Sequence, residues 1–192
     1  MLLLFHLLHP PRGDVILSPM NGMSEYIVAS SRQESRASAT LEILGVAGLL
    51  AVGALLRVPL PFSPVPVTMQ TFCVLIAPFL TRPGRASAGI GLYVALGLAG
   101  APLFAVTGGA TLGYLAGFVA APWIVTAFRR PAWGMIAAMG VIYALGAVWL
   151  SVWLGASMFQ AVMVGVLPFL PGDMLKLIAA HQCASRFCQS NS

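Results

Sequence analysis

The stretch AWGMIAAMGVIYALGAVWLSVWL, residues 132–154, contains 23 positions and no charged side chain. About 20 consecutive apolar residues are long enough to cross the hydrocarbon core of a bilayer as a helix. The whole chain has the same character: 59% of its 192 residues are hydrophobic, 8% are charged, and the mean hydropathy is +0.91. Because about a quarter of the residues in a soluble domain are charged, the sequence predicts an integral membrane protein.

Apolar segments on both sides of this stretch complete the predicted fold. We expect an all-α integral membrane protein with about six transmembrane helices. Four prolines in PLPFSPVP, residues 59–66, forbid a helix there and favour an extended, stiff loop. Residues 157–167 predict a short helix on or near the membrane surface. The other five spanning segments are predicted at 41–58, 67–80, 86–102, 111–128 and 171–187.

The N-terminal region differs in composition from the rest. Residues 1–10 are apolar but too short to span, and residues 14–40 are polar and rich in serine. We therefore expect a flexible tail over 1–40, a substrate-binding membrane domain over 41–187 and a C-terminal tail over 188–192. Translation starting at Met20 or Met23 is an alternative to the printed start.

The arginines predict the topology. If the N-terminus is cytoplasmic, nearly all arginines of the connections fall inside, and only Arg57 falls outside. This is the distribution that the positive-inside rule describes, so we expect both termini in the cytoplasm of a multi-pass protein of the cell membrane. The arginines are too few and too separated for nucleic-acid binding. Those expected inside are Arg32, Arg36, Arg82, Arg85, Arg129, Arg130 and Arg186.

An acid and a base interrupt this apolar background. In FLPGDMLK, residues 169–176, Asp173 and Lys176 are three residues apart, which places them on one face of a helix. Charges at membrane depth are costly and usually face a cavity, so the pair predicts a polar ligand site open to the outer side. A self-contained ion pair, with Asp173 stabilising the first turn of the helix, is the alternative.

Further polar or small groups fall on the same predicted side. A lone Tyr or Gln in a membrane helix is more often an interhelical hydrogen bond or an interfacial anchor than a ligand contact. Phe62 and two loop glycines are expected to pack over a ligand. The candidates are Gln70, Tyr93, Tyr114, Phe62, Gly108 and Gly109.

Motifs for catalysis and for nucleotide binding are absent. Lys176 is the only lysine and follows Leu175, so the chain contains no G-x-x-x-x-G-K-[ST] phosphate loop. The three cysteines match no zinc spacing, and we expect no metal and no cofactor. Ala47 and Ala51 form a small-xxx-small pair, which serves either packing within this chain or docking of a partner helix.

Several of these motifs together resemble the BioY family. RVPLPFSPVPVTMQT, TRPGR, GLYVALGLAGAPLFA, TLGYLAGF and PFLPGDMLK follow one another as in BioY, over residues 41–182. BioY proteins are the biotin-binding S components of energy-coupling-factor (ECF) transporters. The loop LFAVTGGATLGYL is shorter than is common in the family, and Ala110 stands where proline is usual.

The resemblance implies a specific function. It implies six helices, biotin captured near the outer surface, and uptake driven by a transmembrane coupling protein and ABC-type ATPase subunits. It implies that Asp173 and Lys176 belong to the biotin site. It also implies that Ala47 and Ala51 belong to the face that docks onto a partner. Biotin, those subunits and membrane lipid are then the partners, and the chain is a transporter subunit, not an enzyme.

Three other functions remain open at this point. A stand-alone transporter or facilitator would need no ATPase. An intramembrane enzyme would use Asp173 and Lys176 as acid and base. A scaffold protein would bind no small molecule at all.

Overall fold

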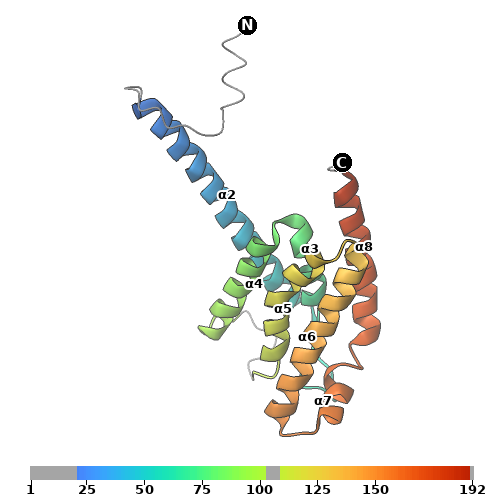
Figure 1. Cartoon of the computed structure of the whole chain (residues 1–192). Helices are drawn as coiled ribbons and strands as arrows, with labels where there is room; N and C mark the ends of the chain where they lie inside the picture. Colours follow the sequence, from blue (N-terminus) through green and yellow to red (C-terminus); the bar gives the residue numbers. More distant parts are fainter. Residues whose placement is uncertain (1–20, 103–108, 191–192) are drawn as a thin grey trace. The chain divides into compact units, whose positions relative to one another are not determined.

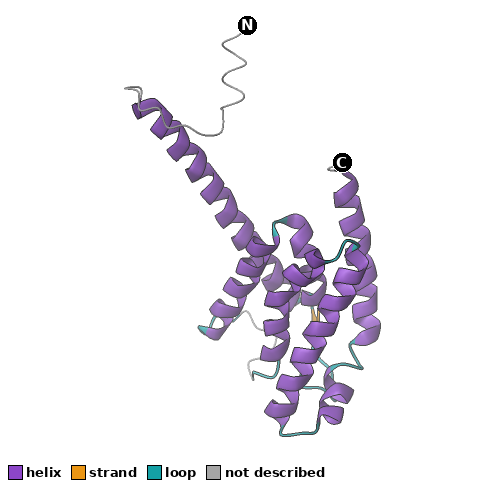
Figure 2. Ribbon diagram, viewed as in Figure 1, coloured by secondary structure: helices purple, strands orange, loops and turns teal. Residues whose placement is uncertain are grey.

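The structure, a computed structural model, describes residues 21–102 and 109–190. The chain divides into two compact units, Met1–Ser38 and Ala39–Ser192. The described part is mostly helical, as predicted (Figures 1 and 2). Its elements are α2 (Asn21–Leu55), β1 (Arg57–Val58), β2 (Val67–Thr68), α3 (Gln70–Leu80), α4 (Pro83–Leu98), α5 (Leu112–Ala127), α6 (Pro131–Leu154), α7 (Met158–Gly165) and α8 (Leu170–Ser190).

Local sequence explains where the helices begin and end. Pro83 and Pro131 open α4 and α6, at the position where proline's missing N–H costs no hydrogen bond. Gly155 ends α6 with a positive φ of 61°, which glycine adopts without strain. Ser157 and Gln160 then form a capping box that starts α7.

Two segments differ from the sequence-based expectation. Residues 21–40, for which composition predicts a flexible tail, are helical and belong to α2. The proline-rich loop is bounded by a two-stranded antiparallel ladder in which Arg57 pairs with Thr68 and Val58 with Val67. The ladder takes up residues 67–68 of the predicted second span, so α3 has only 11 residues and a length of about 16 Å.

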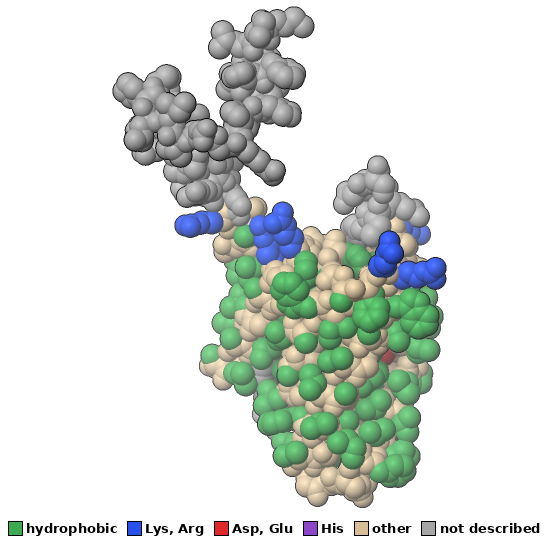
Figure 3. Space-filling view, viewed as in Figure 1, with side chains coloured by type: hydrophobic (Ala, Val, Ile, Leu, Met, Phe, Trp, Pro, Cys, Tyr) green, Lys and Arg blue, Asp and Glu red, His purple; other side chains and the backbone are tan. Residues whose placement is uncertain are grey.

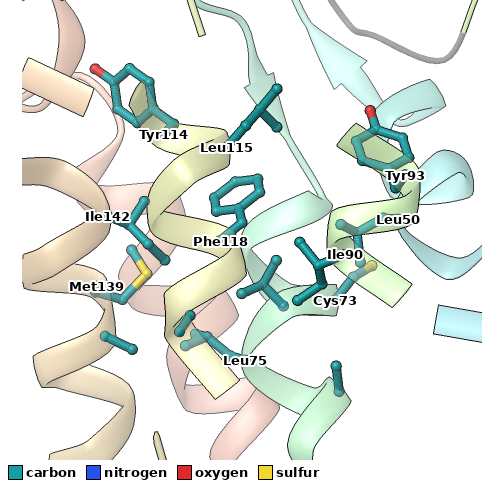
Figure 4. Packing of buried hydrophobic residues seen from close by; sticks show 14 of the residues in the cluster. Leu50, Cys73, Leu75, Ile90, Tyr93, Tyr114, Leu115, Phe118, Met139 and Ile142 are labelled. Carbon is teal, nitrogen blue, oxygen red and sulfur yellow. The ribbon is translucent and has the colours of Figure 1, made fainter. Parts of the chain in front are cut away.

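The core of the second unit is built around α5. This helix contacts α3, α4 and α6, and Figure 4 shows Phe118 of α5 among buried apolar side chains. Glycines allow α5 and α6 to approach closely. A Cβ built at Gly113 would lie 2.4 Å from the carbonyl oxygen of Leu145, and one at Gly117 would lie 2.7 Å from Cα of Ile142.

The described helices include two that are long and apolar enough to cross a membrane, Arg36–Leu55 and Pro131–Leu154. The pair α7 and α8 passes the same test as one broken span, with a bend of 59° between its halves. Helices α3 and α5 are apolar but shorter. These observations support a membrane protein, while the count of six spanning helices stays a prediction.

Charge and hydrophobic surface are separated along the second unit. Arg82 and Arg85 lie at the junction of α3 and α4, and Arg129 and Arg130 lie between α5 and α6. Figure 3 shows Lys and Arg side chains gathered toward one end and hydrophobic side chains over the rest of the face in view. The sequence-based topology rests on the same arginines.

The close approach of α5 and α6 leads to a testable prediction. Gly113→Ala should lower the free energy of unfolding by about 1–3 kcal/mol, because the added methyl group meets backbone that cannot move aside. Gly140→Ala, on α6 where a Cβ meets nothing within 4 Å, is the matched control and should leave stability unchanged or slightly raised. Thermal unfolding in detergent measures both, and equal melting temperatures would contradict the packing described here.

Candidate functional site

A break between two helices places the acid and the base. Helix α7 ends at Gly165, and α8 begins at Leu170. Pro171 is the second residue of α8, in the first turn where proline is tolerated. Asp173 follows in the same turn, and its backbone N–H donates to the carbonyl of Phe169. The carboxylate therefore lies near the positive end of the α8 dipole.

Asp173 is 5% exposed and accepts hydrogen bonds from three other side chains. Lys176 Nζ lies 2.7 Å from its Oδ1 and Thr71 Oγ1 lies 2.9 Å from the same atom. The hydroxyl of Tyr143 donates to Oδ2 over 2.6 Å. The donors come from α3, α6 and α8, so one carboxylate joins three helices.

Lys176 makes hydrogen bonds beyond the one to Asp173. Its ammonium donates to the backbone carbonyl of Thr68 over 2.6 Å, and lies 3.4 Å from Thr71 Oγ1. Thr68 is the last residue of β2, so the ladder after the proline-rich loop supplies this acceptor. Burial of an ion pair is favourable only when additional hydrogen bonds satisfy the charged groups, and both partners here have such bonds.

A second chain of hydrogen bonds lies beside the ion pair. Thr68 Oγ1 donates to Gln70 Oε1 over 3.2 Å, and Gln70 Nε2 donates to the Tyr93 hydroxyl over 2.9 Å. Both Gln70 and Tyr93 are buried. A buried amide and phenol that bond to each other can both rearrange to bind an incoming polar group.

These groups line a pocket together with apolar side chains. Its cavity volume is about 50 Å³, well below the range of small-molecule sites, so a ligand must displace part of the lining to enter. Leu115, Phe118, Ile142 and Phe169 form apolar parts of the lining. The full lining is Val65, Pro66, Thr68, Gln70, Thr71, Tyr93, Thr111, Tyr114, Leu115, Phe118, Ile142, Tyr143, Phe169, Asp173 and Lys176.

Comparison with known proteins decides the family. The model of the BioY family matches residues 28–191, which is most of the chain. The chain belongs to the BioY family. The "Biotin transporter BioY" of Thermotoga maritima is 33% identical over 152 residues, which cover 72% of this chain and 88% of that one. The protein of the same name from Lactococcus lactis subsp. cremoris is 28% identical, with 68% and 79% covered.

A solved structure has a similar fold. The crystal structure of an S component for biotin from an ECF-type ABC transporter superposes with a TM-score of 0.70. The two chains are 19% identical, and the match covers 81% of this chain and 93% of the other. At this identity the likeness supports the fold of this BioY-family chain and leaves its ligand to be argued from the site.

The structure brings together the five candidate residues that the sequence places within helices. Gln70, Tyr93, Tyr114, Asp173 and Lys176 all line the pocket. The Tyr114 hydroxyl donates to the carbonyl of Gly165 over 2.7 Å, so it also connects α5 to the end of α7. That bond is of the interhelical kind, and it leaves the phenol ring facing the pocket.

The three loop candidates are placed differently. Phe62 is 60% exposed and does not line the pocket. Gly109 has a φ of 77°, and its carbonyl accepts a hydrogen bond from Trp149 Nε1 over 2.7 Å. It is also absent from the pocket lining. Gly108 lies outside the described residues.

Four polar residues of the pocket lining were not among the sequence-based candidates: Thr68, Thr71, Thr111 and Tyr143. Tyr143 lies in the middle of the long apolar helix α6, and Thr71 follows Gln70 in α3. A single tyrosine within an apolar span was the available signal, as it was for Tyr93. Only the packing of α6 against α8 shows that Tyr143 contacts Asp173.

The proposed docking pair also lies in an unexpected place. Ala47 is 8% exposed and belongs to the core, while Ala51 is partly buried against it. This arrangement favours packing within the chain for Ala47. The face of α2 turned outward instead contains Gly45 and Gly48, where a Cβ would meet nothing within 4 Å.

Removal of the Tyr143 hydroxyl tests the hydrogen-bond network. Tyr143→Phe should lower the free energy of unfolding by about 1–3 kcal/mol, because Asp173 Oδ2 loses a buried partner. Ser151→Ala removes an exposed hydroxyl of the same helix that bonds to Val148 O, and should change stability much less. A melting temperature for Tyr143→Phe equal to that of Ser151→Ala would mean that the Asp173 carboxylate does not depend on this bond.

Proposed function

We propose that this chain is a biotin-uptake protein, the membrane-embedded subunit that binds biotin on the outer side of the cell membrane. Membership in the BioY family and the names of two relatives support the substrate. The observation that carries the proposal is the pocket that Asp173 and Lys176 line together with apolar side chains. Biotin has the matching polarity.

The polar groups of biotin fit those of the pocket. Its ureido ring offers two N–H donors and one carbonyl acceptor, and its valerate chain ends in a carboxylate. Asp173 accepts from a ureido N–H, and Lys176 donates either to the ureido carbonyl or to the valerate carboxylate. The sulfur-containing ring and the alkyl chain pack against Leu115, Phe118 and Phe169.

Ligand binding replaces hydrogen bonds that exist without it. Asp173 Oδ1 is already bonded to Thr71 and Lys176, so the ligand enters between partners rather than meeting a bare charge. A dry pocket strengthens the new bonds because the dielectric is low. We therefore expect high selectivity for a ligand that satisfies both charges at once.

Orientation and partners complete the proposal. Helices α2 to α6 and the pair α7–α8 form the six spans, with both termini in the cytoplasm. The positions of Arg82, Arg85, Arg129 and Arg130 support this orientation. A coupling protein and ABC-type ATPases then supply the energy that delivers biotin inward; a stand-alone transporter is the alternative.

Ligand-dependent stability tests the substrate. Biotin should raise the melting temperature of the detergent-purified protein, because a ligand that binds only the folded state stabilises it. Asp173→Asn and Lys176→Met should lose most of that rise. A structural analogue in which the ureido ring is opened is the ligand control, since it keeps the carboxylate and the alkyl chain.

The possible outcomes separate a ligand site from a structural pair. A biotin-dependent rise that survives in both variants would place the ligand elsewhere. No rise in the parent protein, with both variants less stable, would mean that Asp173 and Lys176 are structural only, and would remove the support for biotin as substrate.

Dependence on partner subunits is tested on the outward face of α2. Gly48→Leu adds a side chain into open space, so it should preserve biotin binding by the purified protein. In cells that carry the coupling protein and ATPases, it should reduce uptake of labelled biotin by at least about tenfold, because small residues allow close helix contact. Gly91→Leu on α4, also in open space, is the control. Full uptake by Gly48→Leu in cells lacking the ATPases would favour the stand-alone transporter.

A further inference from the structure

A second hollow lies between α6 and α8, outside the pocket described above. On each helix its lining residues recur at spacings of three and four, so each contributes one face. Apart from Tyr143 and Asp173, every lining residue is apolar or glycine. The lining is Ile136, Met139, Gly140, Tyr143, Leu170, Asp173, Met174, Leu177 and Ile178. We call this hollow the α6–α8 groove; its volume is about 400 Å³.

The groove is open to the surroundings of the protein. Ile136, Met174 and Ile178 are each about half or more exposed, and they stand on its two rims. Apolar side chains exposed along helices of membrane-spanning length contact lipid tails rather than water. The groove is therefore a recess in a lipid-facing surface, and a chain of matching shape can fill it.

A cationic group stands at one end of the groove helix α6. Arg129 and Arg130 directly precede Pro131, and both are exposed. Within the described residues neither guanidinium group makes a hydrogen bond or ion pair, while the Arg130 backbone carbonyl accepts from the N–H groups of Trp133 and Gly134. From Arg130 to Tyr143 is 13 residues, or about 20 Å along a helix. That length is about half the thickness of a bilayer with its headgroup regions, which is one leaflet.

We propose that the α6–α8 groove binds one anionic phospholipid. An acyl chain lies along the groove toward Tyr143, and the headgroup phosphate contacts Arg129 and Arg130. This polarity, with charge at one end and hydrocarbon over the rest, is that of an anionic lipid. A second copy of this chain fits less well, because copies inserted in the same orientation would bring like-charged ends together.

Lipid titration of the detergent-purified full chain tests the site. Dioleoyl phosphatidylglycerol should raise the melting temperature in a saturable way, and dioleoyl phosphatidylcholine should do so only at higher concentration. Arg129→Gln/Arg130→Gln should weaken the apparent affinity for phosphatidylglycerol by about fivefold per arginine. Arg82→Gln/Arg186→Gln is the charge-matched control. Arg186 follows Leu177 by nine residues, so it lies on the opposite side of α8.

A second pair of variants tests the groove itself. Gly140→Leu places a large side chain in the groove, and its Cβ has room because nothing lies within 4 Å of that position. It should abolish the saturable response to phosphatidylglycerol, whereas Gly91→Leu on α4 should keep it. The biotin-dependent rise in melting temperature is measured on the same samples. A variant that loses the response to lipid but keeps the response to biotin has lost the groove and not the biotin site.

Three results would overturn the proposal. Equal responses of the parent protein to both lipids would remove the role of charge. A parent-like response of Gly140→Leu would place the lipid elsewhere. Equal affinities for the two double-arginine variants would show that the headgroup does not contact Arg129 and Arg130. If a variant of one pair fails to fold, the other pair of variants still tests the lipid site.

Discussion

The ion pair between Asp173 and Lys176 is the constraint on which the rest of the site depends. A charge at membrane depth is tolerated only where other groups compensate it, and here the compensation comes from three directions. Thr71 of α3 and Tyr143 of α6 donate hydrogen bonds to the Asp173 carboxylate. The carbonyl of Thr68, in the strand ladder, accepts a hydrogen bond from Lys176. The packing of these elements against α8 is therefore set by the need to satisfy one carboxylate and one ammonium.

The proline-rich loop and the short α3 follow from the same requirement. A continuous helix through residues 67–80 would use the Thr68 carbonyl in its own hydrogen bonds. Because residues 67–68 are a strand instead, that carbonyl is available to Lys176. The break between α7 and α8 has a similar effect, since it places Asp173 in a first turn. The Thr68 carbonyl and the Asp173 carboxylate thus both lie where a helix has been interrupted.

Sequence alone predicted the features that depend on neighbours along the chain. Proline at the start of α8, the spacing of Asp173 and Lys176 and the near-absence of charge in residues 132–154 are all local patterns. Features that depend on how helices pack were missed. Tyr143 joins the site only through contact of α6 with α8, and Ala47 turns inward because of helix rotation. Neither rotation nor packing is encoded by spacing within one helix.

The hydrogen bond from Tyr143 to Asp173 separates two chemically different spaces. Both residues line the pocket and also the α6–α8 groove, so their side chains form part of the wall between a polar ligand site and the lipid-facing surface. A ligand that competes for Asp173 also weakens the contact that closes this wall. Occupancy of the groove by an acyl chain would hold Tyr143 in place from the other side. The two sites are therefore expected to be coupled through this one bond with opposite sign, because the ligand weakens the contact that an acyl chain in the groove stabilises.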